Sequence, residues 1–308
     1  MEEISGIKSD DGGFHSGDLW RLKKKLNPRC RDPPTAMVDA NGNLATTHKK
    51  IEEIAVDAYK KRLENRPIKE GLENLRKVKE NLCRQRLRDA SKNKTPPWTM
   101  DDLEKVLNYL KRNKSRDPLG YCNELFRSEV AGKDLKLAIL KLMNKIKFKQ
   151  LFPEILELCD ISSIYKLRGS RNSYDNYRGI FRVTILRSIL DRLIYNDEYK
   201  TIDDNLTDSN VGARKDCNIR DNIFVLNAIS NSIINGKEEE VDIQIYDIEK
   251  CFDALWAQEC INDIYEAGVQ NDKLPLLALE NNGKCAIKIN DGKSERIDLK
   301  NIIMQETV

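Results

Sequence analysis

The sequence is poor in histidine, and its cysteines stand alone. Two histidines occur in 308 residues, and the eight cysteines are scattered singly, without a C-x-x-C pair. Zinc sites draw on clustered cysteine and histidine, and small secreted domains pair their cysteines in a dense disulfide framework. The sequence therefore argues against a zinc site and against a secreted disulfide framework, and it favours a reducing compartment.

Long apolar runs are also absent. No stretch approaches the roughly 20 apolar residues that a membrane-spanning helix needs, and Met1-Glu2-Glu3 opens no signal peptide. The chain is 40% apolar and 33% charged, which is typical of a soluble protein with polar surfaces. Its net charge of +3 is the balance of many charges of both signs, so it says little about partners. We expect no membrane partner.

The order of apolar patterns predicts an α+β chain, helix-rich first and strand-rich last. Helical spacing over 51–62, 71–94, 99–110, 135–146, 186–194 and 223–233 precedes short β-branched runs in the last part. Pro96-Pro97 is the clearest predicted domain boundary. We expect a disordered lead-in over 1–17, a basic helical extension over 18–95, and two further regions over 96–240 and 241–308.

The predicted helix over 71–94 is conspicuously basic. Its cations include Arg84, Arg86 and Arg88. Such a run is usually a solvated helix face, and the second reading is a nucleic-acid contact. Charge alone leaves both open.

The stretch around Asp247 organises the rest of the chain. Val241, Ile243 and Ile245 alternate with polar residues, as in a strand with one buried face, and from Phe252 the apolar period becomes helical. Asp247 is therefore expected at the junction between a strand and the helix that follows it. A carboxylate there can hold a hard cation such as Mg²⁺, or it can simply stabilise the N-terminus of the following helix.

Two strings in this order resemble a known family. "NYRGIF" at 176–181 precedes "DIEKCFDALW" at 247–256, and a basic loop at 113–117 comes before both. Together they resemble the fingers and early palm of non-LTR (LINE-type) retrotransposon reverse transcriptases, from about Trp20 to the last residue. The resemblance implies a right-hand polymerase fold, with fingers over 96–240 and a partial palm over 241–308.

The resemblance also implies roles for individual residues. Asp247 matches the family's first metal-binding aspartate, and Ile248 would offer a backbone carbonyl to a second Mg²⁺. Phe252 matches the bulky residue under the deoxyribose. The residues that match the family's contacts to the incoming dNTP are Lys166, Arg178 and Gln305. The residues expected to contact nucleic acid are Lys114, Arg116, Arg214 and Arg220. The partners implied are an RNA template, a DNA primer and dNTP, and the location is the nucleus or the cytoplasm.

Each of these residues also has a plain structural reading. Lys166 and Arg178 could be ordinary surface cations, and Phe252 is a typical core residue on a helix face. Gly212 could serve only a turn. Asp203-Asp204, between two predicted helices, is best explained as part of a polar loop.

The sequence departs from the family in two ways. Glu306 stands at the position of the glycine in the family's "MQG" motif. The bulk and the negative charge of the glutamate both oppose binding of a triphosphate nearby. The paired Asp-Asp hairpin that follows in the family has no counterpart in the sequence. One carboxylate supplies too few ligands to hold two Mg²⁺ ions, so we expect a polymerase fragment that does not polymerise DNA by itself. The alternatives are an RNA-binding remnant and a decayed element product without a selected role.

Overall fold

The computed structural model describes residues 34–64, 71–212, 214–236, 242–247, 255–289 and 292–299. Helices and strands are mixed, so the predicted α+β class is confirmed. The chain divides into two units, each made of segments far apart in sequence. Unit 1 takes the chain up to Tyr59, Ile161–Ile180 and Ile287–Glu295, and unit 2 takes Lys60–Asp160, Phe181–Ala286 and the chain from Arg296. The predicted boundaries at 17, 95 and 240 remain predictions.

Unit 1 packs a helix with a hairpin. Its elements are β1 (Met37–Val38), β2 (Leu44–Ala45), most of α2 (His48–Glu64), parts of β3 (Leu158–Tyr165), β4 (Tyr177–Val183) and β5 (Gly283–Ile289), the turn η3 (Tyr174–Asn176), and β6 (Gly292–Lys293). Tyr59 of α2 anchors the packing, because its ring lies 6.0 Å from that of Tyr174 and its hydroxyl is 2.8 Å from Ser163 Oγ. Gly179 makes this approach possible, since a Cβ there would lie 2.6 Å from Tyr59 Cε1.

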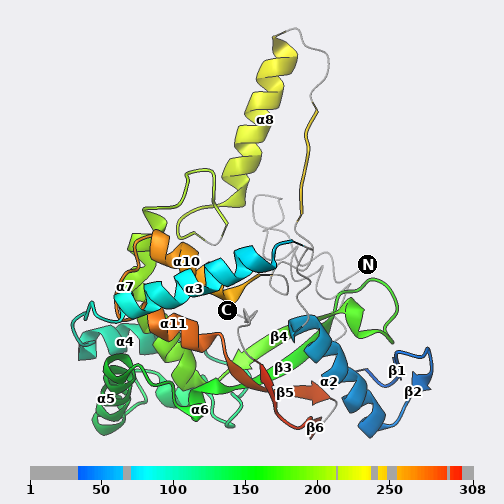
Figure 1. Ribbon diagram of the computed structural model, residues 1–308, viewed down its shortest axis with the longest axis horizontal. Coiled ribbons are helices and arrows are strands. Elements are labelled where there is room, and N and C mark those ends of the chain that lie inside the picture. Colours follow the sequence, from blue (N-terminus) through cyan, green and yellow to red (C-terminus); the bar gives the residue numbers. More distant parts are fainter. Residues whose placement is uncertain are drawn as a thin grey trace, which may run out of the picture. The chain divides into compact units, whose positions relative to one another are not determined.

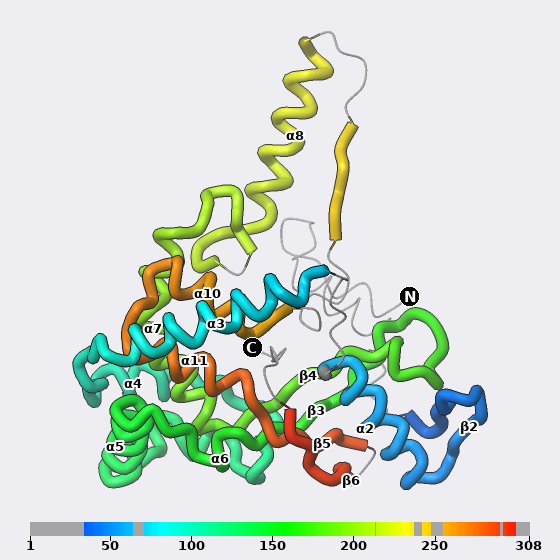
Figure 2. Tube along the Cα trace, viewed as in Figure 1, coloured from blue at the N-terminus to red at the C-terminus, as the bar shows by residue number. Residues whose placement is uncertain are grey.

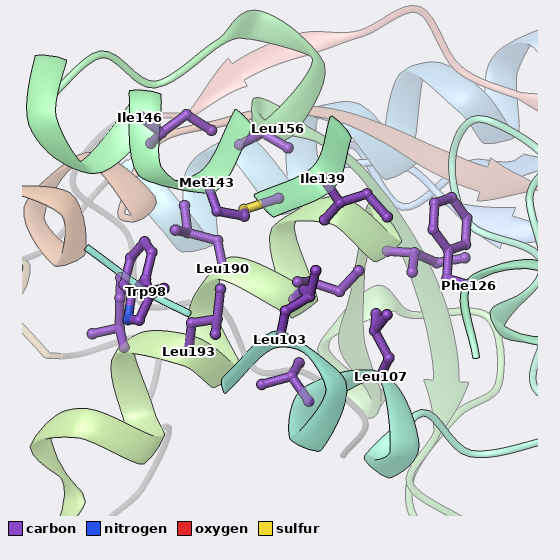
Figure 3. Packing of buried hydrophobic residues seen from close by; sticks show 14 of the residues in the cluster. Trp98, Leu103, Leu107, Phe126, Ile139, Met143, Ile146, Leu156, Leu190 and Leu193 are labelled. Atoms are coloured by element: carbon purple, nitrogen blue, oxygen red, sulfur yellow. The ribbon is translucent and has the colours of Figure 1, made fainter. Parts of the chain in front are cut away.

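Unit 2 is mainly helical. Its elements are α3 (Glu73–Ala90), α4 (Met100–Tyr109), η2 (Asn123–Phe126), α5 (Lys133–Lys149), α6 (Glu154–Glu157), α7 (Ile185–Asp203), α8 (Ile219–Asn235), α10 (Ala257–Glu266), α11 (Leu274–Glu280) and β7 (Ile297–Leu299). Figure 3 shows its main core, in which Leu103 and Leu107 of α4, Met143 of α5 and Leu190 and Leu193 of α7 meet. All five side chains are buried, and burying apolar surface is the main stabilising contribution to such a cluster.

The helix predicted over 99–110 is α4, whose N-cap is Thr99. Thr99 Oγ1 accepts a hydrogen bond from the Asp102 backbone N–H, and the Asp102 carboxylate accepts one from the Thr99 backbone N–H. This reciprocal capping box satisfies donors that a helix N-terminus would otherwise leave unpaired. Hydrogen bonds from the Thr99 backbone N–H and from its hydroxyl to the Asp102 carboxylate hold the pKa of Asp102 below its ordinary value.

A second core joins α3 to α10 and α11. These helices lie side by side in Figures 1 and 2, although α3 and α10 are far apart in sequence. Cys83 and Ala90 of α3 are buried against Ile261 of α10 and Leu274 of α11. Asn262 Nδ2 of α10 donates to the Lys79 carbonyl of α3 at 3.2 Å, which ties these two helices together.

The larger sheet has the strand order β4-β3-β5-β6, and β7 also pairs with β5. In unit 2, β5 and β7 are antiparallel, with Cys285 opposite Ile297. A disulfide joins Cys159 of β3 to Cys285 of β5, with a Cα–Cα distance of 4.7 Å. The isolated spacing of the cysteines gave no signal for it.

The strand predicted over 241–246 is not formed in the described residues. Residues 242–247 belong to no strand, and Ile245 is 89% exposed. A strand is defined by its hydrogen-bonded neighbour, and alternation in the sequence cannot supply that neighbour. The helix predicted to start at Phe252 is α10, which begins at Ala257, and residues 248–254 lie outside the described residues.

The other long helices agree with the apolar periodicity. α2, α4, α5, α7 and α8 cover the segments for which helical spacing was predicted. None of the helices in the described residues is both long enough and apolar enough to span a membrane.

Candidate functional site

Asp247 is the last described residue of the exposed segment 242–247. In this segment Tyr246 Oη donates to Gln244 Oε1 at 2.5 Å. Ile248, Phe252 and Gln305, the other residues expected at the metal and the nucleotide, lie outside the described residues. Their roles stay predictions.

The described residues do not make a magnesium site at Asp247. Mg²⁺ takes six oxygen ligands, commonly one or two carboxylates together with waters and phosphates. Within the described ranges, no group of three or more His, Cys, Asp or Glu side chains is arranged to hold a metal ion. Asp247 alone does not fit the two-ion centre that the family resemblance implies.

Lys166 and Arg178 lie at the same end of the hairpin β3–β4 in unit 1. The Lys166 backbone N–H donates to the Asn176 carbonyl at 2.8 Å, which closes the connection between the strands. Lys166 Nζ donates to the Asp175 carbonyl at 3.0 Å, whereas Arg178, the second residue of β4, is exposed. The sequence strings therefore do bring these two cations to one hairpin end. Asp247 belongs to unit 2, and the structure does not place it relative to them.

The connection between β3 and β4 carries two further cations, which were not predicted as site residues. Arg168 and Arg171 are exposed there, and the Arg171 guanidinium lies 5.5 Å from the centre of the Tyr165 ring. Gly169, with φ of +72°, turns the chain between them. The signal was available in the string "RGSRN", which carries two arginines beside Lys166.

Lys114 and Arg116 are exposed on a loop that is firmly anchored by the next residue. Asp117 is buried, and its carboxylate accepts hydrogen bonds from the backbone N–H groups of Leu119, Tyr121 and Ile185 at 2.9, 2.8 and 3.1 Å. Ile185 is the first residue of α7. The buried carboxylate thus fixes both the loop and the start of that helix, and it leaves the two cations facing solvent.

Arg214 is occupied within the protein, whereas Arg220 is exposed. Arg214 Nε donates to Asp203 Oδ1 at 2.8 Å, and its Nη1 donates to the carbonyls of Thr207 and Asn210. The hydrogen bond from Arg214 holds the pKa of Asp203 below its ordinary value. Asp203 is the last residue of α7, so the polar loop predicted for Asp203-Asp204 begins one residue later, at Asp204. Arg220 lies in the first turn of α8, with no ion pair among the described residues.

The basic helix α3 uses its cations in two ways. Lys79 and Arg86 are bound to α10: Lys79 Nζ contacts Glu259 at 2.5 Å, and Arg86 contacts Glu266 at 2.6 Å and the Asn262 carbonyl at 3.1 Å. The hydrogen bond to Glu259 raises the pKa of Lys79. Arg86 also stacks on Tyr265, 5.1 Å from the ring centre. These two cations hold helices together.

Three other cations of α3 are exposed. Lys77, Arg84 and Arg88 have no ion pair within the described part of the chain. Because they are spaced by seven and four residues, they lie along one stripe of the helix. Of the three arginines predicted to bind nucleic acid, Arg84 and Arg88 are therefore available to an external partner, and Arg86 is engaged.

The comparisons with known proteins add no identification. Neither the protein-family models nor the curated protein sequences that we compared with the chain give a match.

Proposed function

We propose that the chain is part of an RNA-directed DNA polymerase of the non-LTR retrotransposon type. The observation that carries the proposal is the order of its strings, "NYRGIF" before "DIEKCFDALW", together with the position of Lys166 and Arg178 at one end of the hairpin β3–β4. Two cations on one hairpin can grip a triphosphate, with arginine as a fork and lysine as a point charge.

The isolated 308-residue chain is expected to bind nucleic acid without polymerising DNA. Polymerisation needs metal ions clamped between the primer oxygen and the triphosphate, and Asp247 is a single carboxylate. Primer extension with RNA template and dNTP should therefore give no product. A product that disappears on Asp247→Ala would contradict this expectation.

The alternative is an RNA-binding module without catalysis, and the charge pattern of α3 favours it. Lys77, Arg84 and Arg88 form an exposed stripe without acidic partners among the described residues. Phosphate contacts of this kind provide sequence-independent affinity that weakens as salt rises.

Fluorescence anisotropy of labelled RNA and of an RNA–DNA primer–template tests both proposals. Binding is measured at two salt concentrations, with and without Mg²⁺ and a matching dNTP. An affinity that is the same with and without Mg²⁺ and dNTP supports the RNA-binding module without catalysis. Binding of primer–template that tightens with the matching dNTP supports the polymerase assignment. Affinity that is unaffected by salt contradicts both.

A triple variant identifies the surface. Lys77, Arg84 and Arg88 are replaced by glutamine, and the matched control replaces three exposed lysines of α5, namely Lys141, Lys145 and Lys149. If the α3 stripe contacts phosphates, its variant lowers the slope of log affinity against log salt by about 2, at roughly 0.7 for each lost contact to a single strand. Equal effects of the two triple variants would show that only overall charge matters.

A further inference from the structure

Three helices of unit 2 line a pocket of about 330 Å³ that is partly open to solvent. Its apolar lining comes from Cys83 and Leu87 of α3, Ala257 and Ile261 of α10, and Ala278 of α11. Two of these residues are alanines, whose small side chains occupy little of the space between the helices. A volume at this level lies at the lower end of the range of small-ligand pockets.

The polar part of the lining carries one uncompensated positive charge. Arg76 and Glu80 neutralise each other, with Nε and Oε1 2.9 Å apart. Arg76 is also held in place by Trp256, because its guanidinium lies 5.3 Å from the centre of the indole ring. Arg84 is exposed and has no ion pair within the described part of the chain. It therefore sets the charge preference of the pocket.

Two neutral amides complete the lining. Gln258 follows Ala257 in the first turn of α10, and Asn281 lies at the C-terminal end of α11. A side-chain amide both donates and accepts hydrogen bonds, so it can bind a planar heterocycle edge or a ribose hydroxyl. The lining thus combines an apolar surface, hydrogen-bonding amides and a guanidinium.

We propose that this pocket binds a nucleotide unit, with the base on the apolar surface and the phosphate at Arg84. A purely apolar ligand would leave the guanidinium and both amides unused. A free phosphate would leave the apolar surface empty. A nucleotide uses all three, and arginine is well suited to phosphate because its donors form a planar fork.

The proposed site involves neither Asp247 nor the hairpin β3–β4, and it requires no metal ion. It therefore does not depend on the polymerase assignment. The same chemistry is offered by a free mononucleotide and by one nucleotide of a bound RNA strand, and competition distinguishes these sources.

Calorimetry on the purified full chain in EDTA tests the proposal, with AMP, adenosine and inorganic phosphate as separate probes. We expect saturable binding of AMP and much weaker binding of the other two. Phosphate or adenosine binding as tightly as AMP would overturn the proposal, as would the absence of saturable AMP binding. If a short single-stranded RNA displaces AMP, the natural source is a strand. If it does not, the source is a free nucleotide, and the proposed site stands in either case.

Two variants locate the binding. Arg84→Gln removes the charge at an exposed position, so the variant is expected to fold. It should weaken AMP binding about tenfold, as expected for the loss of one charged hydrogen bond. Ala278→Leu fills the pocket without changing charge, and its helical content is checked by circular dichroism. The matched control is Arg88→Gln, one turn further along α3 and outside the lining. Equal weakening by Arg84→Gln and Arg88→Gln would overturn the assignment.

Discussion

The ammonium of Lys147 lies 4.5 Å from the centre of the Trp98 ring and donates a hydrogen bond to the Pro96 carbonyl at 2.6 Å. The Lys147 side chain is fully buried, and no carboxylate within the described residues forms an ion pair with it. A charge buried in this way is costly unless its surroundings compensate. The face of the aromatic ring and the carbonyl oxygen supply that compensation.

Replacing Lys147 by methionine should change the pH dependence of stability. Burial, and secondly the charge of Lys273, lowers the pKa of Lys147 from 10.5. In the window below 10.5 the unfolded chain therefore binds more protons than the folded protein, so this lysine makes stability rise with pH there. Lys147→Met removes that rise, and because the volume is conserved it should cost less than about 1.5 kcal/mol. Urea unfolding at several alkaline pH values measures the difference from the wild type.

Lys145→Met is the control for Lys147→Met. Lys145 is exposed on the same helix, so its loss should leave the pH profile unchanged. A rise with pH that persists in Lys147→Met would show that another group titrates in this window.

Lys273→Met should be far more damaging than Lys147→Met. Lys273 Nζ contacts Glu198 at 2.7 Å and Asp197 at 3.0 Å, and both Lys273 and Glu198 are buried. Removing the cation leaves a buried carboxylate without its partner, which typically costs about 3–5 kcal/mol. Chemical denaturation of the two variants in parallel provides the comparison, and a smaller cost for Lys273→Met than for Lys147→Met would contradict it.

The pH dependence of Lys273 has the opposite sign. Burial lowers its pKa, but the hydrogen bonds to Glu198 and Asp197 outweigh burial and raise the pKa above 10.5. Its stabilising contribution is therefore complete below 10.5 and is lost as pH rises through the folded-state pKa. Stability measured above pH 10.5 should fall in the wild type and fall less in Lys273→Met.

Asp117→Ala should loosen both the basic loop and the start of α7. The substitution leaves three backbone N–H groups without their acceptor, of which that of Ile185 is buried, and an unsatisfied buried donor costs about 1–3 kcal/mol. Arg116→Ala, one residue earlier and exposed, should cost less than about 0.5 kcal/mol yet weaken RNA binding if the loop contacts the backbone. Thermal unfolding of both variants measures the structural role of Asp117, and fluorescence anisotropy measures the RNA contact of Arg116. Equal destabilisation by the two substitutions would contradict the anchoring role of Asp117.

Gly179→Ala should destabilise unit 1. The new Cβ would lie 2.6 Å from Tyr59 Cε1 and 3.2 Å from Ile161 Cγ2, so the packing must shift at a cost of about 1–3 kcal/mol. The control is Gly212→Ala, whose Cβ would meet Asn210 Oδ1 at an ordinary 3.7 Å. Differential scanning fluorimetry compares the two. The glycine of "NYRGIF" thus has a packing reason that does not involve a nucleotide.

The Cys159–Cys285 disulfide should stabilise the oxidised protein. It closes a loop of 126 residues, and restricting the unfolded chain by such a loop is typically worth about 2–4 kcal/mol. Urea unfolding with and without reductant measures the difference, and Cys285→Ala should abolish the response to reductant. Non-reducing peptide mapping that finds no cross-linked peptide would rule out the bond. In a reducing compartment the pair would remain as buried thiols.

Local signals predicted the helices well because their causes are local. The capping box of Thr99 and Asp102 and the apolar spacing of α4 lie within a dozen residues, so the sequence alone contains them.

Tertiary effects were out of reach. Lys147 looks like any other lysine of α5, since its burial depends on Trp98 and Pro96. Arg86 and Arg88 are indistinguishable in sequence, yet only Arg86 meets α10. The strand predicted before Asp247 failed for the same reason, because pairing depends on a neighbour that alternation does not specify. Whether a given charge is exposed or engaged within the protein could therefore not be predicted from the order of residue types.

The helix α8 exposes an unusual amount of apolar surface. Ile219 is 70% exposed, Phe224 is 73% exposed, and none of the helix's described side chains is buried. Chaperones and quality-control proteases recognise surfaces of this kind, because they mark chains that have not found their partners. The lifetime of this protein in a cell would then depend on how quickly α8 becomes covered.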